Sequence, residues 1–90
     1  MLSVKPFTSG DLSGSIYDFP EVGDVLPMHF HPAGEGHLTM VMIGPIRAHS
    51  TNGWDQVLES GRVIDWMPND PHEFVAMVAG ARMTNIRNGA

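Results

Sequence analysis

The chain has 90 residues, with ten acidic against five basic side chains and a formal charge of −5 at pH 7. A chain of this length forms one domain with a thin stability margin, because folding buries only about 60 to 65% of the surface that the unfolded chain exposes. The absence of cysteine excludes disulfides and thiolate-ligated metals, and the few basic residues leave no positive stripe for nucleic acid.

The chain starts MLSVKPFTSGDLSGS, which holds one lysine and no apolar run of signal-peptide length. No later segment approaches the roughly 20 apolar residues of a membrane span. We therefore expect a cytoplasmic protein without a membrane partner. Residues 1–14 are rich in Ser and Gly, so residues 1–22 are expected to form an N-terminal arm and edge strand. Residues 23–90 are expected to form the barrel of the same single domain.

Short β-strands are predicted for the rest of the chain. Ten glycines and seven prolines interrupt it, and no window of a dozen residues keeps a 3.6-residue apolar period. The runs between these breaks alternate or are β-branched, and turn residues such as Gly44-Pro45 separate them. About eight such strands suit a small sandwich or barrel. The expected strands span residues 15–19, 25–30, 37–43, 46–49, 56–58, 62–66, 72–78 and 81–86.

Four of the five histidines, His29, His31, His37 and His72, fall in one recognisable frame at or beside the ends of these strands. Side chains alternate along a strand, so His29 and His31 project to one face about 6 to 7 Å apart and can converge on one ion. His37 and His72 each begin a strand whose same-face neighbours are small or apolar. Imidazole is the commonest protein ligand for transition metals, so this pattern predicts a metal site at one end of an apolar interior. The same-face neighbours are Thr39, Val41 and Ile43 after His37, and Phe74, Ala76 and Val78 after His72.

The spacing of these residues resembles the two motifs of the cupin superfamily. The first motif, G-x5-H-x-H-x3,4-E-x6-G, is similar to GDVLPMHFHPAGEGHLTMVMIG at residues 23–44. The second, G-x5-P-x-G-x2-H-x3-N, is similar to GRVIDWMPNDPHEFVA at residues 61–76. The resemblance implies a conical jelly-roll barrel, the small double-stranded β-helix of cupins. It also implies one divalent transition metal near a mouth of the barrel, with His29, His31, His37 and His72 as ligands.

The position that cupins usually give to glutamate departs from the family pattern. Counted back from Gly44, it holds His37, with one extra residue in the preceding loop. Glu35 fits the other count, with three residues between it and His31, but it puts the closing glycine out of register at Met42. We favour His37 as the ligand, because residues 38–43 must be the strand. Glu35 is then a fifth ligand, a partner of a ligand or a catalytic base. The second motif has Met67, Asn69 and Ala76 where cupins have Pro, Gly and Asn.

Neutral nitrogen ligands suit Fe, Zn, Mn, Ni or Cu, and histidine in place of glutamate raises the positive charge at the metal. That charge favours a small anionic substrate. The favoured activity is that of a metal-dependent dioxygenase, with Glu35 as proton acceptor and Tyr17 as a candidate proton donor. A non-catalytic metal-dependent binding module remains an alternative, as does a cupin isomerase or lyase. For His49, outside both motifs, a structural role is expected.

Two further expectations concern the surface. Small cupins commonly pair, and a short barrel has two strand edges, so we expect a homodimer. Ile16, Tyr17 and Phe19 lie in an N-terminal strand that is expected to add to the partner's sheet. Together the four arginines offer a clamp for an anionic substrate, but each alone is expected to pair with the acidic excess. These arginines are Arg47, Arg62, Arg82 and Arg87.

Overall fold

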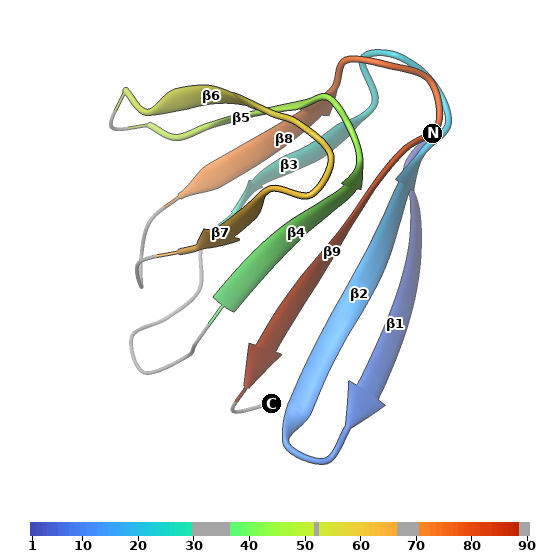
Figure 1. Cartoon of the computed structure of the whole chain (residues 1–90), viewed down its shortest axis with the longest axis vertical. Helices are drawn as coiled ribbons and strands as arrows, with labels where there is room; N and C mark the ends of the chain where they lie inside the picture. The colour runs from blue at the N-terminus through green and yellow to red at the C-terminus, as the bar shows by residue number, and fades with distance from the viewer. Residues whose placement is uncertain (30–36, 52, 67–70, 89–90) are drawn as a thin grey trace.

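The computed structural model describes residues 1–29, 37–51, 53–66 and 71–88, with only the backbone described for His29 (Figure 1). These residues form nine strands and no helix, which confirms the all-β prediction. The described part of the chain therefore has no helix of the length and apolar character needed to cross a membrane. The strands are β1 (Ser3–Ser9), β2 (Leu12–Phe19), β3 (Val25–His29), β4 (His37–Ile43), β5 (Ile46–His49), β6 (Asp55–Leu58), β7 (Val63–Asp65), β8 (His72–Ala76) and β9 (Ala81–Asn88).

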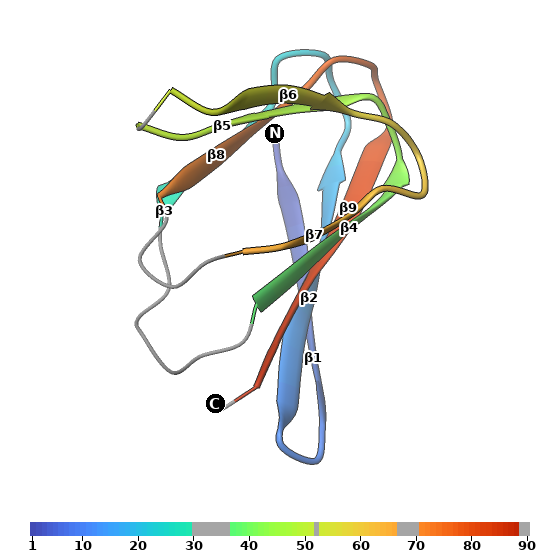
Figure 2. The ribbon, with the colours of Figure 1, turned by 60° about the vertical axis from the view of Figure 1, so that its left-hand side comes forward.

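The strands form two antiparallel sheets that lie against each other as layers (Figures 1 and 2). The five-stranded sheet has the order β1-β2-β9-β4-β7, and the four-stranded sheet has the order β3-β8-β5-β6. Neighbouring strands are often far apart in sequence, as in the pairing of β2 with β9 and of β3 with β8. The turn between β1 and β2 lies at the bottom of Figure 1, beyond the ends of the four-stranded sheet.

Strand alternation builds the core between the two sheets. In β8 the side chains of His72, Phe74 and Ala76 are buried, whereas Glu73 and Val75 are partly exposed. In β4 the alternation is the same, and the side chains of His37, Thr39 and Val41 are buried. The buried apolar core is contributed by both sheets and by the loop after β7. It comprises Phe19, Val41, Ile46, Ala48, Leu58, Trp66, Phe74, Ala76, Ala81 and Met83.

The N-terminal segment lies deeper in the fold than predicted. β1 is the edge strand, but β2 lies inside the five-stranded sheet, paired with β1 on one side and β9 on the other. Phe19 is fully buried in the core. The expected addition of β2 to a partner's sheet is therefore wrong, because neighbours within the same chain already occupy both of its edges. The homodimer itself stays a prediction.

The predicted inward faces of β4 and β8 extend less far in the structure than expected. Ile43 was expected to share the buried face of His37, but the pairing of β4 with β9 shifts register between Val41 and Ile43, and Ile43 is 47% exposed. β8 ends at Ala76 rather than at residue 78, because the backbone N–H of Met77 turns to donate to the carbonyl of Pro45 at 3.2 Å. Val78 therefore lies beyond the strand and does not extend the face of His72.

Candidate metal centre

His37 and His72 come from different sheets and meet inside the barrel. As predicted, His37 is the first residue of β4 and His72 is the first residue of β8. Their side chains are buried, with 3% and 1% of each residue exposed. The two imidazole rings stack with centroids 5.4 Å apart and an angle of 23° between their planes. The structure thus brings together two predicted ligands that are 35 positions apart in the sequence.

The other two predicted ligands are described only in part. His29 ends β3, and its Cα pairs directly with that of His72 in the register of the two strands. His31 and the candidate base Glu35 lie outside the described residues, as does the side chain of His29. Among the side chains that are described, no three from His, Asp and Glu gather into a metal-binding group. The described part of the site is therefore a pair of histidine rings with the backbone of a third histidine beside them.

Trp66, a residue of the buried core, also supports the histidine pair. Its indole ring stacks on His72 with centroids 4.1 Å apart and an interplanar angle of 15°. Its backbone N–H donates to the carbonyl of His37 at 3.0 Å, so the same residue contacts both histidines. Phe74 packs edge-on against Trp66 and His72, and Trp54 packs edge-on against Trp66. The aromatic packing fixes the plane of the His72 ring.

Three polar side chains form a buried chain behind these rings. The indole Nε1 of Trp66 donates to Thr39 Oγ1 at 2.8 Å. Thr39 Oγ1 in turn donates to Asn85 Oδ1 at 2.6 Å. Asn85 lies on β9, outside both sequence motifs, and was not predicted as a site residue. Asn85 could have been found from its period-two spacing with Met83 on the predicted strand 81–86 and with Arg87 just beyond it, because residues at this spacing share one face of a strand.

A cavity of about 320 Å³ lies beside His37, between β2, β3, β4 and β9. Tyr17, the candidate proton donor, lines this cavity together with His37. Among the described residues the hydroxyl of Tyr17 makes no hydrogen bond. A second cavity of about 250 Å³ also borders His37, and Arg87 lines both. The structure therefore places Tyr17 and Arg87 at the same cavity as one predicted ligand.

The four arginines differ in their surroundings. Arg47 pairs with Asp55 at 2.6 Å and Arg82 pairs with Asp18 at 2.6 Å, as expected for surface cations in an acidic chain. Arg62 donates to the side-chain oxygen of Gln56 at 3.1 Å. Arg87 instead donates from Nε to the hydroxyl of Ser13 at 3.2 Å, and it lies opposite His37 in the register of β4 and β9. Of the four, Arg87 is the one at the cavities.

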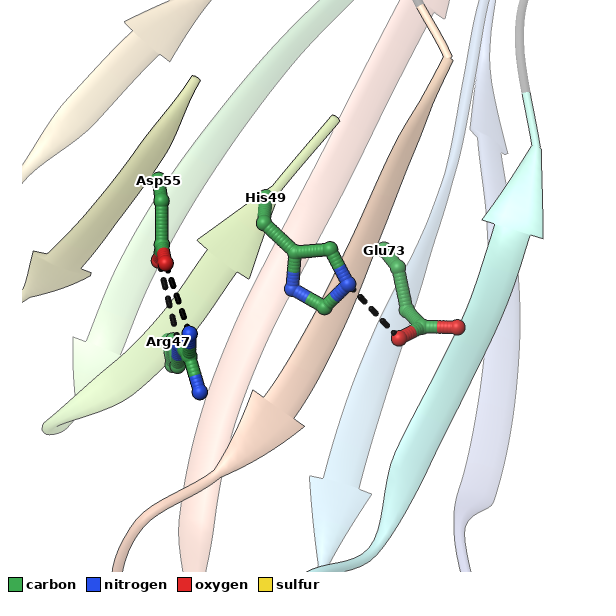
Figure 3. A network of polar contacts seen from close by, with 4 residues as sticks. All are labelled: Arg47, His49, Asp55 and Glu73. Atoms are coloured by element: carbon green, nitrogen blue, oxygen red, sulfur yellow. Dashed lines mark hydrogen bonds and ion pairs between the residues drawn. The ribbon is translucent and has the colours of Figure 1, made fainter. Parts of the chain in front are cut away.

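His49 lies on the opposite, outward-facing side of the four-stranded sheet. Figure 3 shows its ring beside Glu73, with Nε2 3.0 Å from Oε1 of that carboxylate. In the register of the sheet, Asp55 and Glu73 are the two neighbours of His49 on β6 and β8. These contacts place His49 in a surface polar row, apart from His37 and His72, and fit the structural role expected for it.

The ion pair between Arg47 and Asp55 makes part of the stability depend on pH. Hydrogen bonds from the Arg47 guanidinium hold the pKa of Asp55 below its ordinary value of 3.8. A depressed folded-state pKa contributes stability that is present above pH 3.8 and is lost as the pH falls through the folded value. We expect Asp55→Asn to be slightly less stable than the wild type at neutral pH, with the difference vanishing in acid. Urea unfolding at a series of pH values measures this, and a difference that does not narrow as the pH falls below 3.8 would contradict the assignment.

No family model matches the chain, and no curated protein matches its sequence significantly. Solved structures match its fold closely. KdgF from Halomonas sp. aligns with a TM-score of 0.84 at 18% identity, over 99% of this chain and 79% of that protein. A Cupin 2 conserved barrel domain protein from Salinispora arenicola CNS-205 gives 0.82 at 19% identity, over 99% and 76%. The Cupin_2 domain of an XRE family transcriptional regulator from Enterobacter cloacae gives 0.81 at 14% identity, over 99% and 97%.

These likenesses establish the fold of the chain. It is that of a small cupin domain, the double-stranded β-helix, which confirms the fold implied by the two sequence motifs. The identities lie between 14% and 19%, so the comparisons identify the fold and leave the activity to be argued from the chain's own residues.

Proposed function

We propose that this protein binds one divalent transition metal through His29, His31, His37 and His72, and acts on a small anionic molecule in the adjoining cavity. The observation that carries the proposal is the stacked pair His37 and His72, which two different sheets bring together in the interior. Both ring nitrogens of His37 and Nε2 of His72 are shielded from solvent. Burial of such polar groups in an apolar interior costs free energy unless they are hydrogen-bonded or coordinate a metal.

The donor set fits a transition metal of the Fe, Zn, Mn, Ni or Cu group. The described ligands are imidazoles, which suit these metals, and the chain has no cysteine to offer a thiolate. A metal held there would supply Lewis-acid or redox chemistry at the cavity. Trp66 keeps the His72 ring in its plane, and the apolar side chains of Leu26 and Met28 on β3 line the cavity. Tyr17 can donate a proton into the cavity that it lines.

Dioxygenase chemistry with ferrous iron is the activity that we propose, with Glu35 as the proton acceptor. A non-catalytic binding module is the second candidate. It is supported by the likeness to the Cupin_2 domain of a transcriptional regulator, because that domain and this chain cover each other almost completely. A domain of this size and fold therefore also occurs as part of a regulatory protein.

Metal content and tryptophan fluorescence test the metal site. We expect protein purified without added metal or an affinity tag to contain a transition metal, with about one ion per chain after reloading of the stripped protein. In Trp54→Phe, Trp66 is the remaining tryptophan, and its stacking on His72 should make its fluorescence fall when Co²⁺ binds. Absence of saturable quenching, together with no bound metal by elemental analysis, would overturn the metal site.

Oxygen uptake separates the two candidate functions. The stripped protein is loaded with ferrous iron without oxygen, mixed with small carboxylates, diols and thiols, and then exposed to oxygen. Substrate-dependent uptake that Glu35→Gln abolishes is the result expected for the dioxygenase. If ligands bind at the metal centre without turnover and Glu35→Gln changes nothing, the binding module is the correct function.

A further inference from the structure

The buried hydrogen bonds that link Trp66, Thr39 and Asn85 determine which way the amide of Asn85 faces. The indole N–H of Trp66 can only donate, so Thr39 Oγ1 must accept its hydrogen bond. The single hydroxyl proton of Thr39 is then left for Asn85, whose Oδ1 accepts at 2.6 Å. Trp66, Thr39 and Asn85 are all at least nine-tenths buried. The amide oxygen therefore faces Thr39, which leaves Nδ2, a donor, on the other side of the group.

The strand register places Asn85 at the cavity beside His37. Thr39 and His37 of β4 pair with Asn85 and Arg87 of β9, so all four side chains share the inward face of the five-stranded sheet. Asn85 lines the 320 Å³ cavity, and its Nδ2 makes no hydrogen bond among the described residues. Arg87 lies two residues further along the same face. The Oγ of Ser13 accepts from its Nε, which steadies the guanidinium at the cavity.

The described lining of this cavity is unusual for so acidic a chain. It carries the cation Arg87 and contains no Asp or Glu, although acidic residues outnumber basic ones ten to five in the chain. Arginine can only donate hydrogen bonds, and its planar fork matches the two oxygens of a carboxylate. The opposite wall, from β3, presents Leu26 and Met28. The cavity thus has a donor-rich side and an apolar side, at the small end of the range for ligand pockets.

We propose that this cavity binds a small monocarboxylate, with Arg87 and Asn85 Nδ2 donating to the carboxylate and the apolar remainder against Leu26 and Met28. The proposal rests on the proposed function in taking the cavity beside His37 as the substrate site, and it names the substrate class. Trp66 and Thr39 are positioning residues in this arrangement, since they hold Asn85 in the orientation that presents its donor.

Binding to metal-stripped protein tests the carboxylate site separately from the metal. The probes are butyrate and benzoate, with butanol and benzyl alcohol as neutral controls of similar shape. Affinity is measured by amide chemical-shift changes, which also report on the Asn85 side-chain N–H signals. We expect both carboxylates to bind and to shift these signals, and both alcohols to bind at least ~10-fold more weakly, as loss of a charged hydrogen bond would produce.

Two variants and one control complete the test. We expect Arg87→Met and Asn85→Asp each to weaken carboxylate binding at least ~10-fold. Arg82→Met, on the same strand but paired with Asp18, should bind as the wild type does. Arg87 is exposed near the end of β9, so its variant should fold even if Asn85→Asp does not. Equal binding of carboxylate and alcohol would overturn the proposal, as would wild-type affinity in Arg87→Met. Carboxylate binding in a protein that takes up no metal would instead overturn the metal site and leave this one standing.

Discussion

Replacement of His72 by alanine is expected to lower the affinity for Co²⁺ and Fe²⁺ by at least ~100-fold. A ligand supplies a direct bond, and even outer-shell partners of ligands typically contribute 10- to 100-fold in metal affinity. His72 is 1% exposed, and Trp66 and His37 stack on it. No solvent-exposed neighbour can therefore take the place of its ring as a metal ligand. The measurement is titration of stripped protein with each metal, followed by the fluorescence of Trp66 in the Trp54→Phe background.

His49→Ala is the matched control for this loss. His49 lies on a strand next to β8 but contacts Glu73 on the outward face, so its removal should leave metal affinity within about twofold of the wild type. His37→Ala should behave as His72→Ala does, because the two rings form one pair. A loss in His49→Ala as large as in His72→Ala would mean that the two motifs have been aligned to the wrong histidines.

The central strands of the fold could be predicted from local patterns. β4 and β8 each begin at the predicted histidine, because alternating apolar side chains mark the face that the core requires. The sequence does not mark β1 as a separate strand, because its seven residues, all exposed in the structure, carry no apolar alternation. A signal was nevertheless present: Gly10, with a φ of 57°, and Asp11 form a two-residue hairpin turn.

The parts of the site that prediction missed depend on contacts between strands. Trp66 stacks on His72, which joins the end of β7 to the start of β8, and this contact has no local sequence pattern. Asn85 was not predicted, and Arg87 was only one of four arginines considered as a clamp for an anionic substrate. Both lie on β9, outside both motifs, and reach the cavity because β9 pairs with β4 in one particular register. Such a register is decided by the packing of the whole sheet, which strand periodicity alone does not specify.

The largest loss of stability is expected from Phe74→Ala. Phe74 is fully buried at the centre of β8, with Leu26 of β3 and Ala48 of β5 as its register neighbours. Removal of a buried phenylalanine ring typically costs about 3 to 5 kcal/mol, through lost burial and the cavity left behind. The free energy of unfolding of such a domain is about 5 to 15 kcal/mol in total. The variant should therefore lose at least a fifth of it, and often far more. Urea unfolding of metal-stripped protein measures the change as a lower midpoint at an unchanged slope.

Val57→Ala provides the control, because Val57 also lies on a strand of the four-stranded sheet but is 48% exposed, and its change should stay below about 1 kcal/mol. Phe74 packs edge-on against both His72 and Trp66, so its removal should also loosen the ring that the metal site needs. We therefore expect Phe74→Ala to bind Co²⁺ more weakly than the wild type even under conditions where it remains folded, whereas Val57→Ala binds equally. Undiminished metal affinity in folded Phe74→Ala would show that the aromatic packing supports the core without positioning His72.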